Sequence, residues 1–177
     1  VFVIDAQILT LLPKTPDALR EARLFTGQAT ALRSIHYVTR DTDVTLDNDE
    51  QQGWKMTAPK VDDVDPLAVT NFIAFLKAIE GRAFPGERQP QFGLDNPIVS
   101  ITFLYQDKKQ PASILVGGPV PQTDQYYAAT DSGVVTILNA LEVSALTKTA
   151  FDFRNKKLIE FDKKGFAQIS VDIEGVH

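Results

Sequence analysis

The sequence contains no cysteine and only two histidines, which narrows the chemistry that it can support. Without cysteine there is no disulfide, no thiol nucleophile and no cysteine-ligated zinc site. His36 lies on the polar side of an alternating segment, and His177 is the last residue. Neither has a second metal-type ligand at a fixed spacing, so we predict both to be surface residues. The lack of cysteine does not indicate a compartment, because envelope and cytosolic proteins can both lack it.

Long apolar runs and concentrated basic charge are also missing. No segment approaches the roughly 18 consecutive apolar residues of a membrane helix, and no basic segment followed by an apolar one marks a signal peptide. The sequence starts at Val1 inside a repeat, so we expect a longer protein in which an anchor could precede it. The net charge is −5, and acidic residues interrupt or flank the short basic stretches 154–157 and 163–164. We therefore predict no nucleic-acid binding.

The most informative feature that is present is an internal repeat. Lys14-Thr15 with Arg20 and Leu24 reappears 134 residues later as Lys148-Thr149 with Arg154 and Leu158. Apolar positions keep the same offset without a gap: Val3 and Ile137, Leu12 and Leu146, Leu19 and Phe153, Ile35 and Ile169, Tyr37 and Val171. Self-similarity at a fixed period is typical of tandem units, here of domain size.

This repeat divides the chain into three parts. Residues 1–24 correspond to the closing strand-helix element of a preceding unit, 25–158 to one complete unit, and 159–177 to the opening strands of a following unit. We expect these parts to form one compact body. We also expect Ile4–Leu24 and Leu138–Leu158 to superpose, because they share their apolar positions and their Lys-Thr pair.

Hydrophobic periodicity predicts the elements of the complete unit. Alternating segments predict strands at 31–39, 43–46, 54–57, 98–105, 112–116, 126–129 and 134–137. Asp65-Pro66 begins a helix with apolar residues at i, i+3, i+4 and i+7, which Gly81 should end. A second helix is expected at 137–146, and strands of the next unit at 158–162 and 167–173. The short connections predict an α+β fold, with antiparallel sheet or sheets of short strands and two or three helices packed on them.

Candidate sites for chemistry are weak. Asp62, Asp63 and Asp65 could hold a calcium ion, although carboxylates are expected at a helix N-terminus in any case. Asp47-Asn48-Asp49 begins like an EF-hand loop but lacks its glycine and its closing glutamate. Gly117-Gly118 precedes a proline and predicts a turn, not a phosphate-binding loop. We therefore predict no catalytic residue, no cofactor and no metal; a hydrolase using scattered carboxylates such as Glu80 and Glu87 is the least favoured alternative.

Two motifs give the chain a family resemblance. Gly53-Trp54-Lys55-Met56-Thr57-Ala58-Pro59, the helix headed by Asp65, and Phe92-Gly93-Leu94-Asp95-Asn96-Pro97 together resemble a bacterial family known as domain of unknown function 4340. Phe92 replaces the usual tyrosine of that family, and Phe153 stands where Leu19 stands in the first copy of the closing element. The motif residues that match are Gly53, Trp54, Thr57, Pro59, Gly93, Leu94, Asp95 and Pro97. They make structural sense: Trp54 shares a strand face with Met56 and should anchor the core, and Gly93 should take a positive φ.

The resemblance implies a function without assigning a catalytic residue. It implies a repeated, extracytoplasmic domain of the periplasm or cell envelope, linked with ABC-type transport or gliding-motility systems. Protein partners in an envelope complex follow from it, with membrane contact only through an anchor outside these residues. A non-catalytic interaction or scaffold domain is therefore the favoured hypothesis. The alternative is an envelope polysaccharide-binding module, which would need exposed rings from Trp54, Tyr105, Tyr126 or Tyr127.

Overall fold

The computed structural model describes residues 20–60, 64–106 and 110–157. Several expectations lie outside these residues. They are the superposition of the two closing elements, the strands at 158–162 and 167–173, the placement of His177, and the calcium alternative at Asp62 and Asp63.

The described residues form one seven-stranded sheet in which every neighbouring pair is antiparallel. Its order is β3-β2-β1-β4-β5-β6-β7. The strands are β1 (Leu32–Thr39), β2 (Asp43–Asp49), β3 (Gly53–Ala58), β4 (Val99–Tyr105), β5 (Ala112–Pro119), β6 (Gln125–Thr130) and β7 (Val135–Asn139). Each of the seven strands predicted for the complete unit is present, and the α+β fold class is confirmed.

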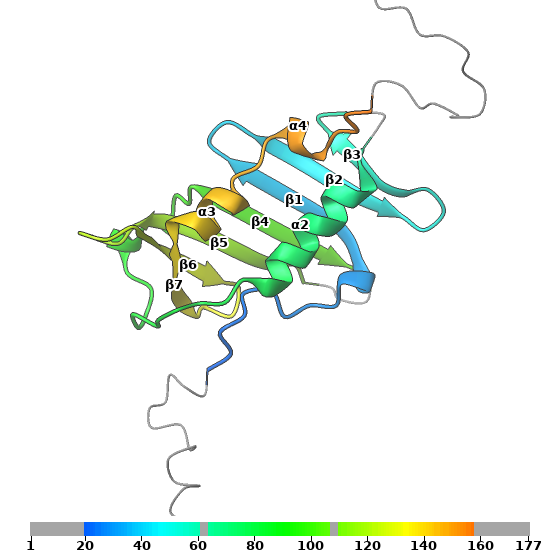
Figure 1. Ribbon diagram of the computed structural model, residues 1–177. Helices are drawn as coiled ribbons and strands as arrows, with labels where there is room; N and C mark the ends of the chain where they lie inside the picture. The colour runs from blue at the N-terminus through cyan, green and yellow to red at the C-terminus, as the bar shows by residue number, and fades with distance from the viewer. Residues whose placement is uncertain (1–19, 61–63, 107–109, 158–177) are drawn as a thin grey trace, which may run out of the picture.

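Three α-helices cover one face of this sheet (Figure 1). They are α2 (Pro66–Ala78), α3 (Ala140–Leu146) and α4 (Ala150–Phe153); two short 3-10 helices, η2 (Ala29–Ala31) and η3 (Pro90–Phe92), lie in connections. The side chain of Asp65 accepts the Leu67 N–H at 2.9 Å, and Pro66 follows it. Both residues act as the sequence predicts, because a capping carboxylate and an N1 proline satisfy or remove amide groups that the first turn leaves unpaired.

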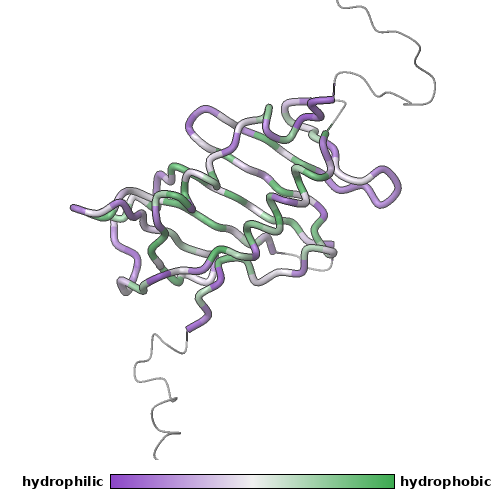
Figure 2. Tube along the Cα trace, viewed as in Figure 1, coloured by the Kyte–Doolittle hydropathy of each residue, from purple (hydrophilic) through white to green (hydrophobic). Residues whose placement is uncertain are grey.

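The main core lies between the helices and the sheet, where apolar residues concentrate (Figure 2). In β4, for example, Ile101 and Phe103 are buried while Thr102 between them is only half-buried and Leu104 is exposed. Edge-to-face aromatic contacts join the layers: the Tyr37 ring lies 6.0 Å from Phe72 and 6.3 Å from Phe153. Because helices cover only this face, a strand such as β4 alternates between buried and more exposed residues.

A smaller apolar cluster forms on the other face of the sheet. Phe92 and Leu94 from the link between α2 and β4 cover Ala129 and Val135, and the Phe92 ring stacks on Tyr127 with centroids 4.0 Å apart. Gly93 has a φ of 68°, as predicted. Close packing explains the glycines of this contact, because a Cβ on Gly117 would lie 2.1 Å from the Phe92 carbonyl oxygen.

The same link also covers the outer edge of β7. The Arg82 N–H donates to the Ile137 carbonyl at 3.0 Å, and the Ile137 N–H donates to the Ala83 carbonyl at 3.1 Å. Thr136 adds a hydroxyl bond to the Ala83 carbonyl at 2.9 Å. The edge strand therefore has backbone partners on both sides at Ile137.

Three local expectations were wrong. The helix expected at 137–146 begins only at Ala140, because β7 continues to Asn139, whose side chain and that of Glu142 form a capping box. Gly81 does not end α2, which stops at Ala78; a Cβ at Gly81 would instead lie 1.9 Å from Thr136 Oγ1. Gly117-Gly118 lies inside β5 and not in a turn. The start of α3 is thus set by a local capping box, whereas both glycines are explained by contacts with distant segments.

Trp54 occupies the face that its strand parity predicts. Met56 on the same face is 2% exposed, whereas Trp54 is half-buried and packs against the edge of the main core. Trp54 therefore supports the core from the edge strand β3 without being enclosed by it.

Tyr37 on strand β1 connects the sheet to α3 and α4, which are called the closing helices here. Its ring is fully buried, its hydroxyl donates to the Leu146 carbonyl at 3.0 Å, and the same oxygen accepts the Lys148 N–H at 2.7 Å. Burial raises the pKa of Tyr37, so the phenol stays neutral and can donate.

The variant Tyr37→Phe tests this connection. It leaves the buried Leu146 carbonyl and the half-buried Lys148 N–H without their partner, so we expect a loss of about 1–3 kcal/mol in the free energy of unfolding, measured in urea. Tyr126→Phe is the matched control, because the Tyr126 ring is only half-buried. Removing its hydroxyl should change the free energy of unfolding by no more than about 0.5 kcal/mol. Equal stabilities of the two variants would contradict the proposed role.

Thr149 and Asp152 form a capping box at the start of α4, and this box lowers the pKa of the Asp152 carboxyl. Asp152 Oδ2 accepts the Thr149 N–H at 2.7 Å and the Thr149 hydroxyl at 2.8 Å. The bond from the Thr149 N–H is the main reason that the pKa of Asp152 lies below its ordinary value of 3.8. A pKa lowered by folding stabilises the protein above the unfolded value, and this stabilisation is lost as the pH falls through the folded value.

We therefore expect Asp152→Asn to lower the free energy of unfolding at pH 7 by about 0.5–1 kcal/mol, as loss of a charged cap does. The difference from the unmodified protein should shrink below about pH 4 and vanish below the folded pKa of Asp152. Urea unfolding across this pH range measures it, with the exposed Glu87→Gln as control. A difference that does not change with pH would exclude the charged cap as its cause.

Candidate functional site

Three hollows in the surface are candidates for a functional site. The first, of about 360 Å³, is called the Arg20 pocket here. The second, of about 330 Å³, lies between α2 and the α3–α4 segment and is called the helix groove. The third is a shallow polar hollow of about 600 Å³ beside the β2–β3 turn.

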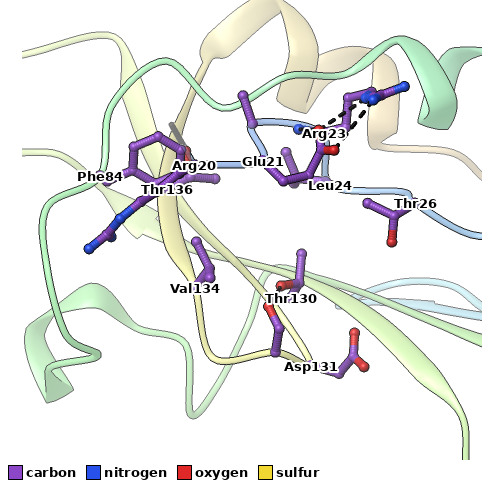
Figure 3. A pocket seen from close by; sticks show the side chains of 12 residues that line it. Arg20, Glu21, Arg23, Leu24, Thr26, Phe84, Thr130, Asp131, Val134 and Thr136 are labelled. Carbon is purple, nitrogen blue, oxygen red and sulfur yellow. Dashed lines mark hydrogen bonds and ion pairs between the residues drawn. The ribbon is translucent and has the colours of Figure 1, made fainter. Parts of the chain in front are cut away.

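The Arg20 pocket forms where residues 20–26 run past the end of α2. The Gly81 N–H donates to the Ala22 carbonyl at 2.6 Å, and the Leu24 N–H donates to the Ile79 carbonyl at 3.3 Å. These bonds fix the segment against the link and the β6–β7 turn (Figure 3). The pocket is lined by Arg20, Glu21, Ala22, Arg23, Leu24, Thr26, Phe84, Thr130, Asp131, Ser132, Val134 and Thr136.

The charged groups of the Arg20 pocket do not converge on one point. Glu21 Oε1 accepts Arg23 Nε at 3.0 Å, and this bond lowers the pKa of Glu21 and raises that of Arg23. The Arg20 guanidinium lies over the Phe84 ring, 5.4 Å from its centroid. Asp131 lies across the pocket from the Glu21–Arg23 pair (Figure 3) and accepts the Ser113 N–H at 3.4 Å. The two carboxylates that line the pocket thus have separate partners.

The helix groove has an apolar floor and a polar rim. Phe72 and Phe153 are buried at its base and Phe75 is half-buried, while Asn71, Lys148 and Asp152 supply polar atoms. Asp152 is already bonded in its capping box.

The helices that form this groove also carry exposed apolar side chains. Leu141 is 81% exposed and lies one helical turn before Ala145, which lines the groove. Leu67 is 64% exposed and lies one turn before Asn71 on α2. Phe151, at 63%, belongs to α4 beside the groove residue Asp152. Large apolar side chains exposed together around a groove are typical of a binding surface.

The polar hollow has two neighbouring carboxylates, from Asp49 and Glu50. Asp49 Oδ1 accepts the N–H groups of Gln51 and Gln52, each at 2.9 Å, and these two bonds lower its pKa. Its negative charge therefore stabilises the β2–β3 turn. The carboxylate of Asp49 serves local structure, as its place in a turn suggests.

The remaining candidates from the sequence lie apart from the three hollows. His36 is on the exposed side of β1, where its Nε2 lies 2.8 Å from Asp43 Oδ1. Glu80 and Glu87 are exposed and lie in none of them. Within residues 20–60, 64–106 and 110–157, no three histidine, aspartate or glutamate side chains form a group that could hold a metal ion.

The family-motif residues occupy two separate places. Gly53, with a φ of 74°, begins β3; Thr57 donates to Asp47 Oδ2 at 2.6 Å, and Pro59 follows the end of this strand. Gly93 and Leu94 pack on β5, while Asp95 accepts Arg88 Nη2 at 2.6 Å and Pro97 follows. The two motifs therefore stabilise opposite parts of the sheet and form no common site.

Sequence reasoning missed both the helix groove and the Arg20 pocket. The exposed leucine at 141 falls at a position where the first copy of the repeat has Gln7, a difference that could have marked it as a surface residue. The Arg20 pocket is assembled from three distant segments, so no local pattern could have revealed it. No helix in the described part of the chain is long and apolar enough to cross a membrane.

Comparisons with known proteins identify the family. Neither the curated proteins nor the solved structures contain a match to this chain. The model of the family described as Domain of unknown function (DUF4340) matches residues 54–176, which is more than half of the sequence. That range contains the Trp54 motif, α2, the Gly93 motif and the closing helices. The chain therefore belongs to the DUF4340 family.

Proposed function

We propose that this is a non-catalytic interaction domain that binds another protein through the helix groove. The observation that carries the proposal is a groove with an apolar floor whose walls, α2 and the α3–α4 segment, also carry the exposed Leu67, Leu141 and Phe151. Fully burying a leucine or phenylalanine side chain contributes about 1.5–3 kcal/mol. A partner that covers these three side chains would therefore gain substantial binding energy from the apolar surface alone.

The polar groups of the three hollows support a non-catalytic role. Glu21, Asp49 and Asp152 each accept hydrogen bonds from residues within three positions in the sequence. A general acid or base needs a group held ready for a substrate, usually with a pKa moved toward neutrality. The pKa values of these three carboxyls are instead lowered by their bonds, which favours permanently charged structural groups.

The cellular setting is part of the same proposal. We infer an extracytoplasmic scaffold of the periplasm or cell envelope, accessory to an ABC-type transport or gliding-motility complex. The support is the family resemblance of the two motifs, and the net charge of −5, which disfavours nucleic acid as a partner. Contact with a membrane would come through an anchor outside these residues.

A polysaccharide-binding module has less support. Stacking on sugars needs neighbouring exposed rings on one surface. Tyr105 is buried, Tyr127 stacks on Phe92, and Tyr126 points to the face opposite Tyr127. Trp54 packs against the core from β3. These four rings form no common platform.

A photo-crosslinking amino acid placed at residues 67 and 141 of the full-length protein in its native cells tests the proposal. We expect both positions to crosslink to the same protein. Leu104 is the matched control, because it is a leucine 45% exposed on the face of the sheet away from the helices. Crosslinking at 104 but not at 67 and 141, or hydrolase turnover by the purified protein, would contradict the proposal.

With the captured protein in hand, Leu141→Ser should weaken its binding by about tenfold to a hundredfold, the loss expected for one buried leucine. Leu104→Ser should leave the Kd unchanged. Calorimetry measures both, and circular dichroism confirms that both variants are folded.

A further inference from the structure

The chain enters and leaves its sheet at opposite ends of α2. At the start, Ala22 and Leu24 bond to Gly81 and Ile79, just beyond the C-terminal end of this helix. At the end, the Asp65 N–H donates to the Phe153 carbonyl at 2.9 Å, and Arg154 forms an isolated bridge with Val64, just before the N-terminal end of α2. Figure 1 shows the two ends of the described chain at opposite ends of α2.

The repeat relates these two ends to each other. Arg154, which forms the backbone bridge between the closing element and Val64, corresponds to Arg20 in the copy that precedes this unit. If the preceding unit closes in the same way, Arg20 belongs to its bridge. Ala22 is already bonded to the following unit. Only Glu21 then lies between the last residue of one unit and the first residue of the next.

So short a connection limits the distance between units. Two residues of extended chain span at most about 7 Å. The N-terminal end of α2 in the preceding unit must therefore lie beside the C-terminal end of α2 in this one. The surface at that place is the Arg20 pocket, where Phe84, Leu24 and Val134 contribute apolar atoms.

We propose that the preceding unit binds in the Arg20 pocket of this unit. The part that binds is the closing element of the preceding unit, the segment Ile8–Leu19. The segment is directly joined to the pocket through Arg20, whose guanidinium already lies on Phe84. It carries Ile8 and Leu11, whose equivalents in this unit, Glu142 and Ala145, are only half-buried, so both side chains can pack against the apolar part of the pocket. Consecutive units then touch and hold a fixed orientation.

This joint sets the shape of a tandem array. The 13 residues of α2 extend about 20 Å, and the chain crosses that length between its two ends. Each unit therefore advances the array by about that distance or more, head to tail. The array is therefore rigid, because consecutive units hold a fixed orientation and no flexible linker separates them. The inference concerns the joint between units and does not depend on what the helix groove binds.

Distance measurement between two spin labels tests the joint. Thr10 and Ser144 are equivalent positions in consecutive copies of the closing element, and Ser144 is exposed. In the full-length protein, Thr10→Cys and Ser144→Cys, as the only cysteines, carry the labels. We expect a single narrow distance distribution. A broad distribution, as a freely moving segment would give, overturns the proposal.

Two pairs of variants distinguish a segment that is bound in the Arg20 pocket from one that is only connected to it through the chain. Inserting Gly-Ser-Gly-Ser between Arg20 and Glu21 should broaden the distribution, whereas the same insertion after the exposed Gly86 should not. Phe84→Ser removes part of the pocket and should also broaden the distance distribution, while Leu104→Ser, at an exposed position on the other face of the sheet, should leave it unchanged. If Phe84→Ser has no effect, the preceding unit does not bind in the pocket. Loss of partner crosslinking with a narrow distribution retained would reject the proposed function alone.

Discussion

The burial of one sheet face under three helices is the constraint on which this structure depends, and the Tyr37 hydroxyl holds that arrangement together. It lies on the interior strand β1 and bonds to both the last carbonyl of α3 and the amide of Lys148. A neutral buried phenol can satisfy one acceptor and one donor at once, which few side chains can do in an apolar setting. The closing helices are thereby fixed over the same core that α2 covers.

Much of this fold is predictable from the sequence because helices cover one face of the sheet, whereas the other face is covered only where Phe92 and Leu94 pack on it. That asymmetry imposes the alternation of strands such as β4, and Asp65-Pro66 marks the start of α2 by chemistry that is local. Two glycines whose roles escaped prediction depend on distant partners. Gly81 is needed because Thr136 lies against it, and Gly117 because the Phe92 carbonyl does.

The candidate sites were far less predictable than the fold. A helix groove is made of side chains that look like ordinary surface or core residues until their neighbours are known, as Leu141 and Ala145 illustrate. The family motifs led to structural residues instead. Gly93 has the positive φ that its turn requires, and Asp95 accepts a hydrogen bond from Arg88. In a domain without converging ionisable groups, function lies in surface shape, which a single sequence encodes only indirectly.

The backbone bonds of Arg82 and Ala83 along β7 have a consequence for proteins that carry such units in series. An open edge strand offers its N–H and C=O groups to any other strand, and similar sheets on one chain meet at very high local concentration. At β7 those groups are already engaged at Ile137 by the unit's own link. Neighbouring copies are thus discouraged from exchanging or merging strands there while the protein is being made, so each can complete its own sheet.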